Sequence, residues 1–184
     1  MMKAVKISLA FTALLWAVRL IDIFYPADLN QFGILPRTAE SLPGILFSPL
    51  LHADFIHLIS NTFPVFFLLF VILFFYEKTS PHVFLTVWFL GGLLVWSFGR
   101  NAMHIGASGL IYGFASFLVF SGIFRKNIKS ILIAILIVAM YGGLVYGILP
   151  LQSWISWEGH LAGAAAGAVS AYLFRNKAGY IQDK

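Results

Sequence analysis

Long apolar runs alternate with short polar connections along almost the whole chain. Six of these runs are about as long as the roughly 20 residues that a helix needs to cross a bilayer. They lie at approximately residues 5–24, 56–76, 82–99, 107–124, 130–149 and 155–174. The pattern predicts an all-α membrane protein with six transmembrane helices, in which residues 1–184 form a single transmembrane domain.

The composition agrees with this fold class. Hydrophobic residues make up 60% of the chain and charged residues only 10%, whereas soluble domains are roughly half apolar and a quarter charged. The chain contains no cysteine, which excludes disulfides, thiolate metal sites and a cysteine nucleophile.

The net charge of +5 reflects topology and gives no support for a nucleic-acid partner, because most basic residues fall on one side of the predicted helices. That side carries Lys3, Lys6, Lys78, Arg125, Lys126, Lys129, Arg175, Lys177 and Lys184. Arg37 and Arg100 lie in loops on the other side. The positive-inside rule therefore predicts that both the N- and the C-terminus are cytoplasmic.

The longest connection, residues 25–54, is predicted to be an outer loop. It carries several prolines and apolar residues throughout, which is unusual for a solvated linker. Two interpretations remain open: a segment that lies partly in the membrane interface, or a packed extracellular loop.

Ser108 lies between Gly106 and Gly109, where a short polar loop becomes an apolar run. Glycines allow a tight turn, and a serine at a helix start lies among N–H groups that favour negative charge. Tyr112 is one turn further along the same face. This motif suits a nucleophile, but small residues in apolar helices also simply permit close packing.

Polar residues also occur near the outer ends of the second and sixth predicted helices. His52 precedes the second helix, and His57 and Asn61 share one of its faces. Such residues usually face the interior of a membrane protein, where they perform chemistry or bridge helices by hydrogen bonds. The spacing lacks a carboxylate and the HExxH pattern, so we expect no bound metal.

The sixth predicted helix carries His160 beside a seam of small residues, Gly159, Gly163 and Gly167. Gly109 and Gly113 form a similar seam on the fourth, and we expect the two seams to meet. His160 would then lie level with Ser108. A serine, a histidine that can accept its proton, and nearby donors are the groups that acyl transfer requires.

On these three motifs the chain resembles the rhomboid family of intramembrane serine proteases. The resemblance implies a six-helix rhomboid-like bundle in which Ser108 is the nucleophile and His160 its general base. It implies an oxyanion hole made by His57, Asn61 and the Ser108 N–H, and supporting roles for His52, Tyr112, Gly106, Gly109, Gly163 and Gly167. No carboxylate is placed to orient His160, because Glu158, two residues earlier, points to a different side of the helix.

The implied activity is a serine endopeptidase that cleaves transmembrane segments of other membrane proteins, without a cofactor. By analogy with the family, the chain is a multi-pass protein of a bacterial plasma membrane. Substrates would enter laterally through displacement of the fifth helix or of the 149–156 connection. One departure is that Ile45-Leu46-Phe47-Ser48 stands where many members carry a Trp-Arg pair.

Three other functions are compatible with parts of this pattern. The first is a catalytically inactive rhomboid-like protein that binds transmembrane helices, although both Ser108 and His160 are present. The second is a haem protein with a histidine pair such as His57 and His160. The third is a transporter, which the clustering of ionisable residues at one depth disfavours.

Overall fold

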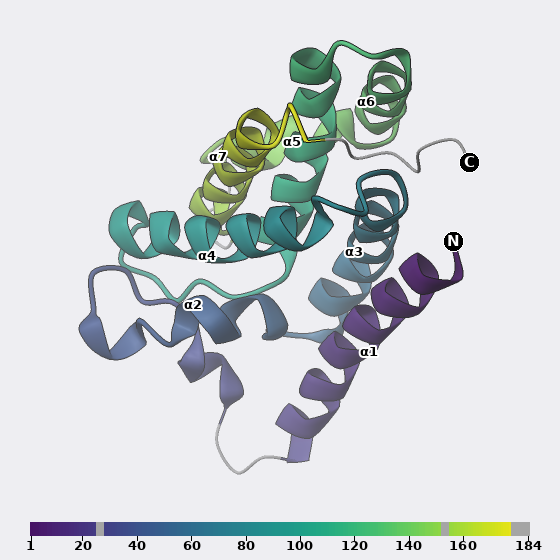
Figure 1. The fold of residues 1–184 in the computed structure, drawn as a ribbon. Coiled ribbons are helices and arrows are strands. Elements are labelled where there is room, and N and C mark those ends of the chain that lie inside the picture. Colours follow the sequence, from purple (N-terminus) through teal and green to yellow (C-terminus); the bar gives the residue numbers. More distant parts are fainter. Residues whose placement is uncertain (25–27, 152–154, 178–184) are drawn as a thin grey trace.

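The computed structural model describes residues 1–24, 28–151 and 155–177. Six long helical segments dominate it (Figure 1). They are α1 (Met2–Phe24), α3 (Phe55–Phe75), α4 (Ser80–Phe98), α5 (Ser108–Arg125), α6 (Ile128–Tyr141) with its 3-10 continuation η4 (Gly142–Ile148), and α7 (Trp157–Leu173). Part of the outer-loop prediction (residues 25–27), Trp154 in the 149–156 connection, and Lys184 lie outside the described residues.

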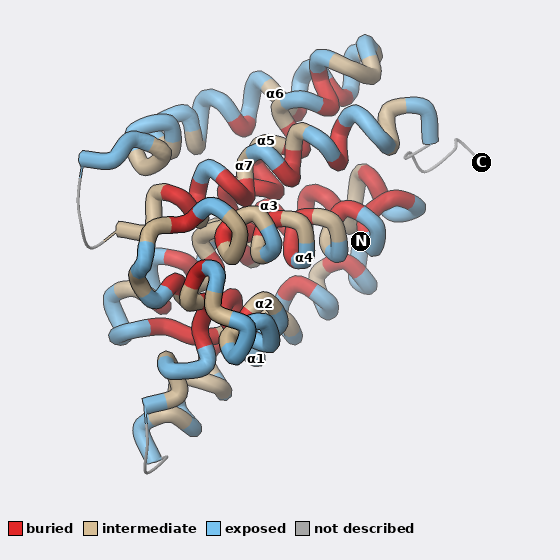
Figure 2. Tube along the Cα trace, turned by 90° about the vertical axis from the view of Figure 1, so that its left-hand side faces the viewer, coloured by how far each residue is buried: buried red, intermediate tan, exposed pale blue. Residues whose placement is uncertain are grey.

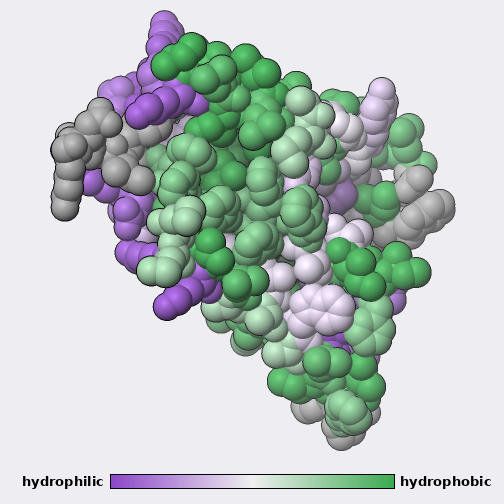
Figure 3. All heavy atoms as spheres, turned by 90° about the vertical axis from the view of Figure 1, so that its right-hand side faces the viewer, coloured by the Kyte–Doolittle hydropathy of each residue, from purple (hydrophilic) through white to green (hydrophobic). Residues whose placement is uncertain are grey.

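Five of these segments are long and apolar enough to cross a membrane: α1, α3, α4, α5 and α6 with η4. The sixth, α7, has 17 residues, which is at the short end of the range for a spanning helix. Six spans and cytoplasmic termini therefore stay predictions, whereas the all-helical class is confirmed. Figure 3 shows that apolar side chains cover most of one face of the molecule, as contact with lipid requires.

The fifth apolar run, predicted as a span at residues 130–149, is a candidate span at Ile128–Ile148, but it is not one continuous α-helix. The α-helix ends at Tyr141 and a 3-10 helix continues to Ile148. Three glycines, Gly142, Gly143 and Gly147, lie in or at the start of this segment, and glycine is a poor α-helix former because its backbone is so free. A 3-10 stretch of this length is uncommon and often marks a hinge.

The outer segment folds into short helices, η1 (Leu29–Phe32), η2 (Ala39–Ser41), α2 (Gly44–Phe47) and η3 (Ser48–Leu50). It packs against α4: Trp88 Nε1 donates a hydrogen bond to the Ile45 carbonyl (3.0 Å), and Trp96 Nε1 donates to the Thr38 carbonyl (3.0 Å). Leu46, by contrast, is exposed. The segment is thus packed on one side and presents apolar residues outward on the other.

The glycine seams of α5 and α7 meet, as the sequence predicts. A methyl group at Gly163 would lie 2.8 Å from the carbonyl carbon of Gly109, and one at Gly167 would lie 2.8 Å from that of Gly113. Backbone therefore packs directly on backbone along this contact. Figure 2 shows buried positions concentrated where α5 and α7 run together in the interior, and this close contact sets the position of the candidate site.

Candidate active site

A cavity of about 730 Å³ opens between α3, α5 and α7. The structure places five of the predicted site residues on its wall, each near the N-terminal end of its helix: His57, Asn61, Ser108, Tyr112 and His160. Residues more than 100 positions apart in the sequence thus share one space. The predicted glycines Gly109, Gly163 and Gly167 lie in the seam between α5 and α7, where they bring these two helices together.

Ser108 is the first residue of α5. Gly106 precedes it with a φ of +108°, a conformation that residues with a side chain rarely adopt. A methyl group at Gly106 would also lie 2.6 Å from two atoms of the His57 ring. Glycine at position 106 therefore lets the turn before Ser108 pack against the His57 ring. The first N–H groups of α5, which begins at Ser108, have no partners within the helix.

His57 and Asn61 contribute polar groups from α3. Asp54 caps the start of this helix by accepting a hydrogen bond from the His57 backbone N–H (2.7 Å). Asn61 is 5% exposed, and its Nδ2 has no hydrogen-bond partner among the described residues. A buried donor without a partner is costly, so this amide is available to an oxygen atom that enters the cavity.

His52 supports His57 from the loop before α3. The two rings meet edge to face with centroids 5.0 Å apart, and His52 Nδ1 lies 3.3 Å from the Leu50 carbonyl oxygen. Burial, with a smaller contribution from the neighbouring His57, lowers the pKa of His52 to about 4. His52 is therefore neutral at pH 7.

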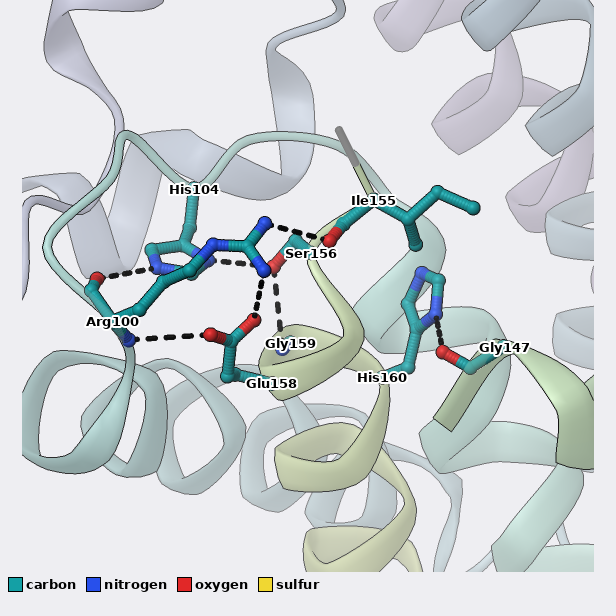
Figure 4. Close-up of polar contacts among 8 residues, drawn as sticks. All are labelled: Arg100, His104, Gly147, Ile155, Ser156, Glu158, Gly159 and His160. Atoms are coloured by element: carbon teal, nitrogen blue, oxygen red, sulfur yellow. Dashed lines mark hydrogen bonds and ion pairs between the residues drawn. The ribbon is translucent and has the colours of Figure 1, made fainter. Parts of the chain in front are cut away.

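His160 is held by two contacts. Its ring stacks on Tyr112 with centroids 4.0 Å apart and planes 8° from parallel. Its Nδ1 lies 2.8 Å from the Gly147 carbonyl oxygen (Figure 4). A carbonyl oxygen only accepts, so Nδ1 carries the proton and Nε2 of the neutral ring is free to accept one. This tautomer suits a general base that acts through Nε2.

A polar clasp, defined as Arg100, His104, Ser156 and Glu158, joins the loop before α5 to the start of α7 (Figure 4). Glu158 accepts a hydrogen bond from the Arg100 backbone N–H (3.3 Å) and pairs with the Arg100 guanidinium (3.6 Å). His104 Nδ1 lies 2.6 Å from Ser156 Oγ, which also accepts from the Gly159 N–H (3.2 Å). The Glu158 carboxylate thus binds Arg100 in the clasp and not His160.

The clasp also fixes the state of His104. Its Nε2 lies 3.1 Å from the Arg100 carbonyl oxygen and must donate to it, so Nδ1 accepts from the Ser156 hydroxyl. Burial lowers the pKa of His104, in agreement with this neutral form. The clasp was not predicted from the sequence. Its one sequence signal is Ser156 followed by Glu158, a serine N-cap with an acid in the first turn.

The apolar helices, and the cavity among them into which several polar side chains point, define an integral, multi-pass membrane protein. Residues 39–177 match the model of the rhomboid domain, and the chain belongs to the rhomboid family.

Relatives in other organisms are similar over most of the chain. An uncharacterised protein of Mycobacterium tuberculosis is 40% identical over 176 residues, covering 90% of this chain and 72% of that protein. One from Mycobacterium leprae is 38% identical, covering 90% and 69%. A protein of Acanthamoeba polyphaga mimivirus, whose rhomboid designation is provisional, is 30% identical over 167 residues, covering 84% and 85%.

Proposed function

We propose that this protein is an intramembrane serine endopeptidase that cleaves transmembrane segments of other membrane proteins with a Ser108–His160 dyad. One observation carries the proposal: Ser108, His160 and the unpartnered amide of Asn61 face one cavity, and His160 Nδ1 is occupied in a way that leaves Nε2 as an acceptor. Membership of the rhomboid family, which includes intramembrane serine proteases, supports the same reaction.

In the first half of the reaction, Ser108 Oγ attacks the carbonyl carbon of the substrate while His160 Nε2 takes the hydroxyl proton. The oxyanion that forms is stabilised by the Ser108 N–H, Asn61 Nδ2 and His57. His160 then gives the proton to the leaving amine nitrogen as the C–N bond breaks. In the second half, His160 Nε2 takes a proton from water as its oxygen attacks the ester carbonyl carbon. His160 then returns this proton to Ser108 Oγ as the ester C–O bond breaks, which frees Ser108 and releases the product acid, which ionises to a carboxylate.

The substrate must present a free carbonyl, and an intact helix hides its carbonyls in hydrogen bonds. Segments that unwind easily are therefore favoured, and glycine near the cut should raise the cleavage rate. The family resemblance adds the expectation of a small residue just before the cut.

The test is labelling of the detergent-purified protein with a fluorophosphonate probe, which reacts with activated serines. Wild type should label, whereas Ser108→Ala and His160→Ala should not. Ser60→Ala is the matched control, because Ser60 lines the same cavity and is expected to keep full labelling. Loss of labelling in the control, in a folded sample, would contradict the assignment of Ser108.

A catalytically silent, helix-binding protein is the second candidate. It is favoured by one observation: among the described residues, no hydrogen bond joins Ser108 to His160. In proteases, the hydrogen bond between serine and histidine is often long without substrate and shortens when substrate binds, so this observation is compatible with both candidates. A folded wild type that binds transmembrane peptides but never labels would support this second function.

A further inference from the structure

The 3-10 segment η4 touches the candidate dyad directly. A methyl group at Gly147 would lie 3.0 Å from Tyr112 Cζ, 3.2 Å from His160 Nδ1, and closer still to the Tyr112 hydroxyl. The backbone of Gly147 is therefore in close contact with the stacked rings of Tyr112 and His160. Only glycine fits there without displacing η4 or the rings.

The Gly147 carbonyl is also the hydrogen-bond partner of the His160 ring, at 2.8 Å from Nδ1 (Figure 4). In serine hydrolases with a triad, an acid holds the histidine in the tautomer that leaves Nε2 free. Here the nearby carboxylate of Glu158 faces Arg100, so a backbone carbonyl occupies the position that an acid occupies in a triad.

We propose that Gly147 is a positioning residue for His160, and that the dyad is active only while η4 packs against Tyr112 and His160. This inference rests on the proposed function. When η4 moves away, His160 loses the acceptor that fixes its tautomer and ring orientation. The segment that would admit a substrate laterally is then the same segment that completes the base.

The packing of η4 makes such movement feasible. Of the five candidate spans, the one formed by α6 and η4 has the smallest fraction of buried residues: 11% of its most apolar 18 residues, compared with 56% for α5. The buried residues of α6, namely Ser130, Ile133 and Ile137, lie in its α-helical part, and η4 has none. Segments with few buried apolar contacts open at low free-energy cost.

The segment η4 could act in two ways: it could only admit substrates, or it could also position His160. A small fluorophosphonate reaches the cavity without entry of a helix, so a segment that only gates substrates should not limit its reaction. If η4 positions the base, displacing it should instead slow labelling. Gly147→Ala makes the displacement, and Gly143→Ala is the matched control because a methyl group at 143 would have no neighbour within 4 Å.

We expect Gly147→Ala to label at least about tenfold more slowly than wild type, in line with the loss on removing a histidine's orienting partner in metal sites. Gly143→Ala should label like wild type. Combining Gly147→Ala with Tyr112→Phe removes the hydroxyl that the new methyl group meets, and should restore part of the rate. If Gly147→Ala alone fails to fold, this double variant is compared with Tyr112→Phe.

Nitrogen-15 NMR of the histidine rings in micelles supplies a second readout, with His160→Ala to identify the signal. Wild type should show the Nδ1–H tautomer and Gly147→Ala should lose it. A Gly147→Ala protein with unchanged labelling rate and tautomer would overturn the role of Gly147 and leave the protease proposal standing. An unlabelled wild type would overturn the protease proposal, while the tautomer comparison would still decide whether Gly147 orients His160.

Discussion

Replacing Gly163 tests whether the contact between α5 and α7 aligns the proposed dyad of Ser108 and His160. A methyl group there would lie 2.8 Å from the Gly109 carbonyl carbon and 3.1 Å from its Cα, whereas an ordinary carbon–carbon contact is about 3.5–4.0 Å. Gly163→Ala must therefore push the two helices apart by about 0.7 Å or more. Gly109 directly follows Ser108, so this shift moves Ser108, the proposed nucleophile, away from His160.

The expected magnitudes differ for stability and activity. Overpacking typically costs about 1–3 kcal/mol, and the better helix propensity of alanine offsets up to about 1 kcal/mol. The net loss in the free energy of unfolding should be about 0–2 kcal/mol. A misplacement near 1 Å can cost on the order of a hundredfold in rate, so labelling of Ser108 should fall more than stability does.

Gly91→Ala is the matched control. Gly91 lies on α4 and faces the same part of α7, but a methyl group there would be 3.7 Å from Gly163 Cα, which is ordinary contact. Both variants are compared by thermal unfolding in detergent and by the fluorophosphonate labelling rate of folded protein. Equal labelling rates for Gly163→Ala and Gly91→Ala would refute the reasoning that the seam sets the dyad.

Three further predictions concern groups around the cavity. Because the pKa of His52 is about 4 in the folded protein and 6.5 as its ordinary value, the unfolded chain binds more protons between these pH values. Protonation of His52 in the unfolded chain therefore leaves the free energy of unfolding unchanged above pH 6.5 and lowers it by at most about 3 kcal/mol as the pH drops to 4. Thermal unfolding should show this decrease, and His52→Gln should reduce it. Glu158→Gln weakens the polar clasp, so it should lower the free energy of unfolding by about 1 kcal/mol and slow labelling. Glu40 is exposed, and Glu40→Gln should change neither quantity. Equal melting temperatures for the two variants would contradict the role of the clasp. Tyr112→Phe keeps the ring that stacks on His160 and should label nearly as wild type, whereas Tyr112→Ala loses about 1 kcal/mol of stacking, or about fivefold in rate; equal rates for the two would show that stacking does not position the base.

The sequence alone determined the fold class and the residues of the candidate site. Lipid leaves backbone groups no partner outside a helix or a closed barrel, so the length of each apolar run predicts a spanning helix, and five such segments are long and apolar enough in the structure. Gly163 and Gly167 predicted a close helix contact because small residues let backbones approach. The family resemblance, which the rhomboid-domain match confirms, rested on side chains that can be read directly from the sequence.

Only the tertiary structure decided what orients His160. Its partner is the carbonyl of Gly147, and every residue has a carbonyl, so no residue type signals this role. The change from α-helix to 3-10 helix after Tyr141 falls at Gly142 and Gly143, but glycines also occur inside membrane-spanning helices, so they did not specify it. The pairing of Arg100 with Glu158, 58 positions apart, depends on how α4 and α7 pack, which no local pattern specifies.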